Sequence, residues 1–415
     1  MWWWSLTFIV VHLLEQGSSH VVPVTPETAK LRRKPKFATE FNGEEWPANS
    51  EHNQKKQVNF YVIGAWGGEV KAGRVEPFRW AKRGKSNLID EKAQHLVANR
   101  MRDLAERTSG PAFVVNAGGS FYPQGIQQFC DAMFPSLRLS SNSQINKVFQ
   151  NMYIGTNLAE KQWLGVLGES EYGFKRFDSG WVQALYYTWS RNSRWVMPAQ
   201  YWSRRYNFDD FAADFFFIDN NVVKALAPEV HEGLCSSQHS TRSCAYNNPE
   251  GPKNPHHCVG WFQDTWKAQQ EWLEEKLRES DVAWQVVVMY HPPTHPWWQA
   301  VADRWGIDLI ICAGRHVQKV VYRGKLGATA VIMSGGGGGI WSEDLPSEDG
   351  QDDAYGFMDV SISRNQLMIE AHSHGGIHGD QIIRSRTAVV PRYRNINYVA
   401  LHNHTEPHTI DLDFV

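Results

Sequence analysis

Two short apolar runs, each followed by a histidine, constrain the fold of this chain most strongly. The run at 285–289 leads to His291, and the run at 309–312 leads to His316. Apolar, β-branched runs that stop at polar residues, Gly or Pro are typical of buried strands. In α/β sheets, binding groups gather at the carboxyl ends of such strands. We therefore expect His291 and His316 to lie at neighbouring strand ends and to face the same ligand.

The rest of the chain alternates strands with helices. Strand 58–63, a helix that Asp90 can cap, and strand 112–115 form a strand–helix–strand unit, which favours a parallel pair. A second helix is expected over 262–279. Further strands are expected at 151–158, 215–219, 330–334, 357–362 and 367–370, the last two as an antiparallel pair. This order predicts an α/β fold.

Composition excludes some partners. With 415 residues of which 42% are hydrophobic, the chain can bury a large core. Its net charge of −2 provides no field that would attract nucleic acid. The 19 Trp are interpreted as packing residues. A carbohydrate-binding surface that uses Trp297 and Trp298 is the weaker alternative.

The chain is expected to divide into four parts. Residues 1–19 read as a signal peptide, 20–56 as a flexible leader, 57–380 as the domain and 381–415 as a tail. After the signal peptide no apolar run is long enough to cross a membrane. Asn403 begins a glycosylation sequon. These features predict a secreted protein, or one in the lumen of the secretory pathway.

The cysteines fit that compartment. Two of Cys235, Cys244 and Cys258 are expected to form a disulfide, whereas Cys312 lies in a predicted strand and should be a buried thiol.

Two other motifs contain residue types that are found in metal-binding or phosphate-binding sites. His372, His374 and His378 are interpreted as an exposed His-rich turn, with a metal site as the alternative. The glycine run 335–339 is interpreted as a flexible turn, because no Lys-Ser/Thr follows it as in a phosphate-binding loop.

The strand ends together resemble the calcineurin-like metallophosphoesterases, specifically the purple acid phosphatases of the tartrate-resistant type. The resemblance extends from about residue 58 to about residue 375. It implies two packed mixed β-sheets flanked by helices. The matching segments are Gly64–Gly68 (family motif GDWGG), Gly118–Tyr122 (GDNFY), Gly155–Leu158 (GNHD), Tyr290–Pro293 (GHYP) and Ala313–His316 (GHDH).

In that family seven side chains from these motifs hold two metal ions. When the family's ligand positions are matched to this sequence one by one, the ligands that remain are Tyr122, His291 and His316. The other ligand positions are occupied by Ala65, Gly119, Thr156 and Gly314. The histidine that assists the leaving group in the family is replaced by Asn157.

These losses matter because two divalent ions roughly 3.5 Å apart repel each other by ~19 kcal/mol at an effective dielectric of 20. Anionic ligands offset that repulsion, and Ala and Gly offer no donor atom. We therefore expect no bound metal, and a pseudophosphatase that acts as a binding or scaffold protein with a protein partner. The alternative is an active acid phosphatase for phosphomonoesters, with two ions (Fe with Fe, Zn or Mn) as the resemblance implies.

The pattern of loss resembles that of the apicomplexan gliding-associated members of the family. A Trp-rich segment at 194–202 contributes to this resemblance. Those proteins end in a membrane helix, and no corresponding span is expected here.

Overall fold

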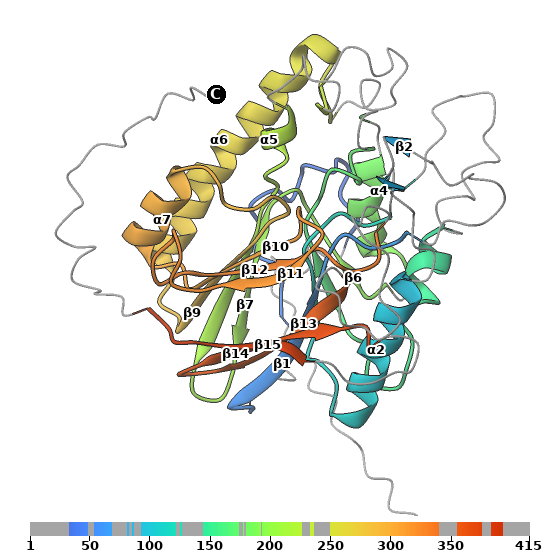
Figure 1. The fold of residues 1–415 in the computed structure, drawn as a ribbon. Helices are drawn as coiled ribbons and strands as arrows, with labels where there is room; N and C mark the ends of the chain where they lie inside the picture. The colour runs from blue at the N-terminus through green and yellow to red at the C-terminus, as the bar shows by residue number, and fades with distance from the viewer. Residues whose placement is uncertain are drawn as a thin grey trace, which may run out of the picture.

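The computed structural model describes most of the predicted domain (Figure 1). The described residues are 33–48, 54–68, 81–82, 85–86, 93–121, 125–126, 144–173, 177, 180–191, 193–225, 233–235, 250–339, 355–375 and 383–392.

Two mixed β-sheets form the centre of the molecule. The seven-stranded sheet has the order β15 (Ile383–Val389), β14 (Leu367–Ser373), β13 (Gly356–Ser363), β1 (Gln57–Ile63), β4 (Val114–Asn116), β5 (Trp163–Gly165) and β6 (Trp195–Val196). The six-stranded sheet has the order β11 (Gln318–Val321), β12 (Ala330–Ser334), β10 (Leu309–Cys312), β9 (Trp284–Val288), β8 (Ala212–Phe217) and β7 (Trp202–Asn207). A separate hairpin joins β2 (Ala81–Lys82) to β3 (Lys85–Ser86).

Helices complete the layers. They are α2 (Ala93–Arg107), α4 (Gly180–Tyr186), α5 (Val222–Ala225), α6 (Pro255–Glu279) and α7 (Trp297–Trp305), with a π-turn at Asn146–Gln150 and a 3-10 turn at Tyr187–Trp189. Helices α6 and α7 lie on the side of the six-stranded sheet, and α2 lies near the seven-stranded sheet (Figure 1).

The two sheets pack face to face. Phe60 of β1 meets Phe215 of β8 edge-on, with ring centroids 5.7 Å apart, inside a shared apolar core. The opposite faces bury Tyr61 with Met101 of α2, and Val287 with Leu273 of α6. The predicted α/β class with two mixed sheets flanked by helices is therefore confirmed.

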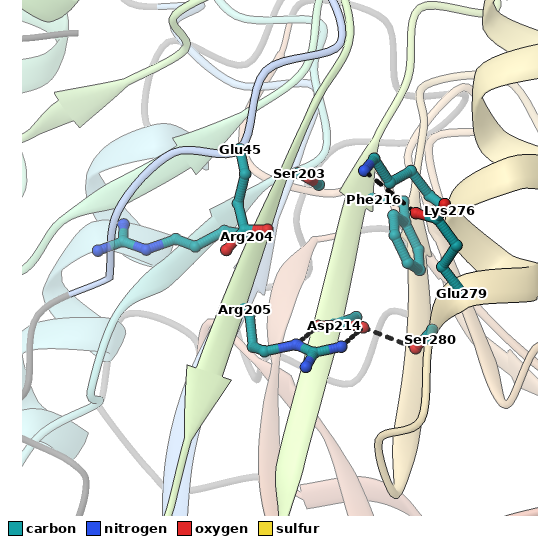
Figure 2. Close-up of a pocket in the computed structure, with 9 residues that line it drawn as sticks. All are labelled: Glu45, Ser203, Arg204, Arg205, Asp214, Phe216, Lys276, Glu279 and Ser280. Carbon is teal, nitrogen blue, oxygen red and sulfur yellow. Dashed lines mark hydrogen bonds and ion pairs between the residues drawn. The ribbon is translucent and has the colours of Figure 1, made fainter. Parts of the chain in front are cut away.

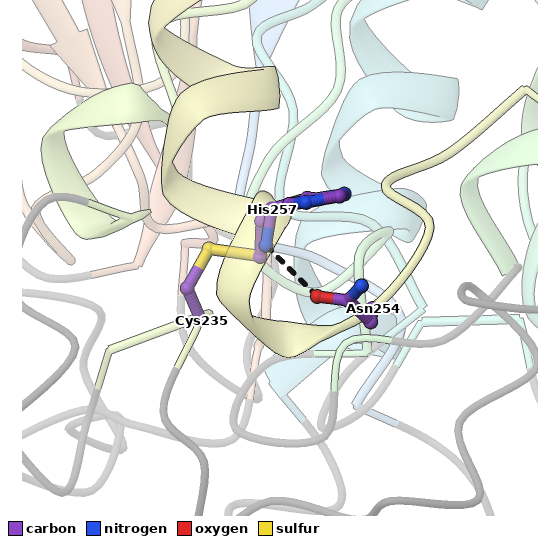
Figure 3. The surroundings of a disulfide bond; sticks show 4 residues. Cys235, Asn254 and His257 are labelled. Carbon is purple, nitrogen blue, oxygen red and sulfur yellow. Dashed lines mark hydrogen bonds between the residues drawn. A yellow bond between two sulfur atoms is a disulfide. The ribbon is translucent and has the colours of Figure 1, made fainter.

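Local signals account for the start of α6. Asn254 caps the helix by accepting a hydrogen bond from the backbone N–H of His257, and Pro255 follows, as expected at a first helical position. A disulfide between Cys235 and Cys258 ties this turn to the preceding loop (Figure 3). The expectation that two of the three cysteines form a disulfide is confirmed, and Cys312 is buried as expected. Cys244 lies outside the described residues.

The strand predicted at 151–158 is wrong. Residues 151–153 and 155–160 form turns, and the third parallel strand is β5, paired with β4. Tyr153 is buried against Trp163, with ring centroids 4.4 Å apart. The apolar residues at 152 and 153 thus fill the core from a bend, and a short apolar run cannot distinguish a bend from a strand.

The predicted leader and tail also need correction. Residues 33–48 are part of the folded unit, because Ala38 and Phe41 are buried and Glu45 forms a parallel bridge with Ser203 of β7. The tail predicted from residue 381 contributes β15 to the larger sheet.

The side chains at positions 297, 298, 372 and 374 are buried, as expected for the tryptophans and contrary to the expectation for the histidines. Trp297 and Trp298 pack against Trp266 of α6, so they offer no surface to a sugar. His372 and His374 are also buried, which rules out an exposed turn at these two positions. Within the described part of the chain, no helix is both long and apolar enough to span a bilayer.

Candidate functional site

The ends of the central strands meet at one place. The Gly118 carbonyl after β4 accepts a hydrogen bond of 2.9 Å from the N–H of Ala65 after β1, which joins the two strand ends. The Gly64 carbonyl accepts a bond of 3.0 Å from the N–H of Gly337, which follows β12 of the other sheet. In the same sheet, the N–H of Gly314 donates to the Tyr290 carbonyl over 2.7 Å. The loops expected to carry the site are therefore in contact, and the glycine run 335–339 is a packed turn.

His291 is buried at this meeting point. Its backbone N–H donates to Oδ1 of Asn220 and its carbonyl accepts from Nδ2 of the same side chain, over 3.0 and 2.8 Å. Its Nε2 lies 3.5 Å from Oε1 of Glu169 and has no hydrogen-bond partner. Burial, together with the nearby charge of Lys224, lowers the pKa of His291 to about 3, so the imidazole is neutral.

Glu169 was not foreseen in the site. It follows β5 in the segment Gly168–Glu171, and the ammonium of Lys224 lies 3.7 Å from its carboxylate. Because β5 is the third parallel strand, Gly168–Glu171 takes the place that the sequence comparison gave to Gly155–Leu158. The apolar run at 163–167, which also ends at a glycine, was the signal that could have revealed it.

Asn157 lies elsewhere, and Thr156 precedes it in the same turn. The Asn157 amide donates to the carbonyls of Ala105 and Thr108, at the end of α2. An added Cβ at Gly110, which precedes β4, would lie 2.7 Å from the Cβ of Asn157. Asn157 is thus at the amino end of β4, whereas His291 is at the carboxyl ends of the strands.

The ring of Tyr290 fills the space between three glycines. An added Cβ would lie 3.2 Å from this ring at Gly118, 2.6 Å from it at Gly119 and 2.9 Å from it at Gly168. Tyr290 is itself buried. A carboxylate at position 119, where the family has its bridging aspartate, would collide with this ring.

A buried carboxylate also occupies the loops. Glu171 accepts hydrogen bonds from the backbone N–H groups of Gly119, Ser120 and Gly168, over 3.2, 2.6 and 2.8 Å. Burial raises the pKa of Glu171, and these N–H donors oppose that effect. The backbone N–H groups therefore offset part of the cost of burying this carboxylate.

The other predicted positions are spread around this centre. Ala65 is buried with a positive φ of 50°. An added Cβ at Gly314 would lie 3.2 Å from Nδ1 of His291, so a side chain there requires His291 to shift. His316 is half-buried on the loop after β10. Tyr122 and Asn403 lie outside the described residues.

These residues do not fit a pair of metal ions. Of the inherited ligands that the structure describes, His291 and His316 remain, and a ring fills the space at Gly119. Glu169 could contribute an oxygen, but its Oε1, which faces His291, also lies 3.7 Å from the ammonium of Lys224. A pair of divalent cations needs several anionic ligands, which this arrangement does not supply.

One hollow lies away from this centre, on β7, β8 and α6. Figure 2 shows Arg205 and Asp214 joined across it, with N–O distances of 2.7 and 2.9 Å, and Ser280 donating to the same carboxylate. Since these groups neutralise one another, the hollow presents no catalytic pair.

The architecture and the strand-end loops define a calcineurin-like metallophosphoesterase fold of the purple acid phosphatase type. Purple acid phosphatase 4 of Arabidopsis thaliana is similar to this chain, with 24% identity over 342 residues that cover 78% of this chain and 82% of the relative.

A solved structure shares the fold, and a second one is similar over part of its length. GAP50, described as the anchor in the inner membrane complex of Plasmodium, superposes with a TM-score of 0.51 at 15% identity, over 82% of this chain and 91% of that one. Purple acid phosphatase PPD1 from seeds of yellow lupin (Lupinus luteus) gives a TM-score of 0.43 at 12% identity, over 87% of this chain and 56% of that one. No protein-family model matches the sequence.

Proposed function

We propose that this protein is a pseudophosphatase of the secretory pathway, which uses the purple acid phosphatase fold to bind or anchor another protein. The observation that carries the proposal is the ring of Tyr290 packed against Gly118, Gly119 and Gly168, in the space of the bridging carboxylate. The three N–H donors that hold Glu171 support it, because they provide for an anion without a cation.

Two further observations agree with this function. GAP50 has the same fold and is an anchor, which shows that the fold serves such a role in another protein. The disulfide between Cys235 and Cys258 suits an oxidising compartment.

The alternative function is a phosphomonoester hydrolase with an altered metal site. It is favoured by the unpartnered Nε2 of His291 beside the carboxylate of Glu169, since both atoms are metal donors. Two observations count against it. The ammonium of Lys224 neutralises Glu169, and a single ion would bind without the carboxylate that bridges the two ions in the family.

A phosphatase assay with and without added metal separates the two functions. We expect purified protein to show no turnover of para-nitrophenyl phosphate from pH 4 to 7, with or without added Fe, Zn or Mn. The His291→Ala variant should behave identically. Metal-dependent turnover that His291→Ala abolishes would exclude the pseudophosphatase. If no turnover is found, an affinity pull-down from the secretory fraction would identify the bound protein.

A further inference from the structure

A second group of donor atoms lies on the outer face of the seven-stranded sheet. Asp359 of β13 stands directly opposite Glu370 of β14, and His372 follows Glu370 by two residues on the same face. A carboxylate oxygen of Asp359, one of Glu370 and a ring nitrogen of His372 all lie within 4.8 Å of one another. None of these residues belongs to the strand-end loops around His291.

His372 is the central feature of this group. It is 2% exposed, and its ring stacks on Phe357 with an interplanar angle of 17°. Neither ring nitrogen has a hydrogen-bond partner, although Nε2 is 3.4 Å from Oε2 of Glu370. Leaving a buried polar group unsatisfied is unfavourable, so this imidazole is suited to an additional partner.

Outer hydrogen bonds hold both carboxylates in place. The Asn59 amide donates to the two oxygens of Asp359 over 3.1 and 3.2 Å. Arg386 donates to Oε1 of Glu370 over 2.6 Å, which leaves Oε2 turned toward His372. Metal-binding carboxylates are commonly oriented by such partners.

A local irregularity accompanies the cluster. The pairing of β14 with β15 shifts register between Ala371 and His372. Bulges of this kind re-aim side chains and are frequent beside functional sites.

The cluster also places like charges together. Asp359 and Glu370 are directly opposed on neighbouring strands, an arrangement that destabilises a sheet when both are ionised. Arg386 and the buried Arg100 of α2 supply positive charge nearby, and Arg100 acts on His372 from the helix side. A cation between the carboxylates would offset their repulsion more directly, because it would contact both.

We propose that Asp359, Glu370 and His372 bind one divalent transition-metal ion of the zinc class. Mixed imidazole and carboxylate ligands match Zn²⁺, whereas Ca²⁺ and Mg²⁺ prefer oxygen alone. Tetrahedral ligands about 2.1 Å from zinc are ~3.4 Å apart, so the donors must approach one another slightly. The half-exposed Glu370 side chain can supply that movement, and the ion would link β13 to β14.

Zinc titration of the metal-stripped protein by calorimetry tests this site. We expect saturable binding of one ion per chain, with a dissociation constant that rises at least ~10-fold in His372→Gln and in Glu370→Gln. Asn59→Ala keeps all three ligands and removes only the hydrogen bonds from Asn59 to Asp359, so it should weaken binding by ~10- to 100-fold. His374→Gln, two residues further along the chain, is the matched control and should bind as the wild type does.

Thermal unfolding guards against variants that do not fold. Each variant should unfold cooperatively without zinc, and zinc should raise the melting temperature of the wild type but not of His372→Gln. If His372→Gln fails to fold, Asn59→Ala decides the question. The proposed site would be wrong if the wild type showed no saturable zinc binding, or if wild type and Asn59→Ala bound zinc equally. In that case the nearby arginines would balance the charge of the two carboxylates. Binding that is lost in His291→Gln and kept in His372→Gln would move the ion to the strand ends, and would count against the pseudophosphatase as well.

Discussion

At the scale of single residues, an exchange of side-chain size between two positions distinguishes this chain from the purple acid phosphatases. The family motifs have Asp at position 119 and Gly at position 290, whereas this chain has Gly119 and Tyr290. The tyrosine ring takes up the space that the missing carboxylate leaves. Either reversal alone should therefore be unfavourable, and the two reversals should compensate each other.

A double-mutant cycle tests this compensation. Gly119→Asp should destabilise the fold by about 1–3 kcal/mol through overpacking, and Tyr290→Gly by about 3–5 kcal/mol through a cavity. The double variant should be at least ~1 kcal/mol more stable than the sum of the two effects. Urea unfolding measures the three differences. Strict additivity would show that Tyr290 does not occupy the position of the carboxylate.

At the scale of elements, the segment at 33–48 behaves as part of the domain. The Trp46 N–H donates to the Ser203 carbonyl over 2.8 Å and the Ser203 N–H donates to the Glu44 carbonyl over 3.1 Å, so the segment extends the six-stranded sheet beyond β7. Phe41 anchors it in the core between the sheets. Covering an edge strand in this way also removes a surface that promotes aggregation.

Two phenylalanines of this segment provide a matched comparison. Phe41 is 2% exposed and Phe37 is 40% exposed. Phe41→Ala should lower the free energy of unfolding by about 3 kcal/mol, because it empties a buried site. Phe37→Ala should change it by less than about 0.5 kcal/mol. Similar small losses for both in chemical denaturation would mean that the segment is not anchored.

At the scale of the whole molecule, a buried hydrogen bond connects the two sheets. Tyr172, in the loop after β5, donates to Asp219, which follows β8, over 2.5 Å. Asp219 also accepts from the backbone N–H and the amide of Asn221. Burial outweighs these donors and raises the pKa of Asp219 to about 6.

This carboxyl predicts how stability depends on pH. Because the pKa of Asp219 is higher in the folded state than the value of 3.8 expected for the unfolded chain, its contribution is complete below about pH 4 and is lost as pH rises through 6. The difference in unfolding free energy between wild type and Asp219→Asn should shift by about 2 kcal/mol against the wild type from pH 4 to 7. A difference that stays constant across this range in denaturant titrations would refute the assignment.

Much of the fold could be predicted from the sequence. Buried strands such as 286–288 and 309–312 are marked by apolar runs rich in β-branched residues, and the two antiparallel strands near 357–370 are marked by alternation. These patterns follow directly from which side chains must avoid water. The losses at Ala65, Gly119 and Gly314 could also be read directly, since a missing donor atom is a property of the residue itself.

Only the tertiary structure decided what fills the vacated space and which residues meet there. The turn at 151–160 and β5 are both apolar and short, so local pattern could not tell which of them ends beside His291. The ring of Tyr290 and the carboxylate of Glu169 each contact segments far apart in the sequence, and this proximity depends on how the strands pair and how the sheets pack. The cluster around His372 lies within one hairpin, but it depends on the register of β13 and β14, which the alternating pattern alone does not fix. Chemistry that depends on distances between such segments is fixed by packing, and no local pattern encodes it.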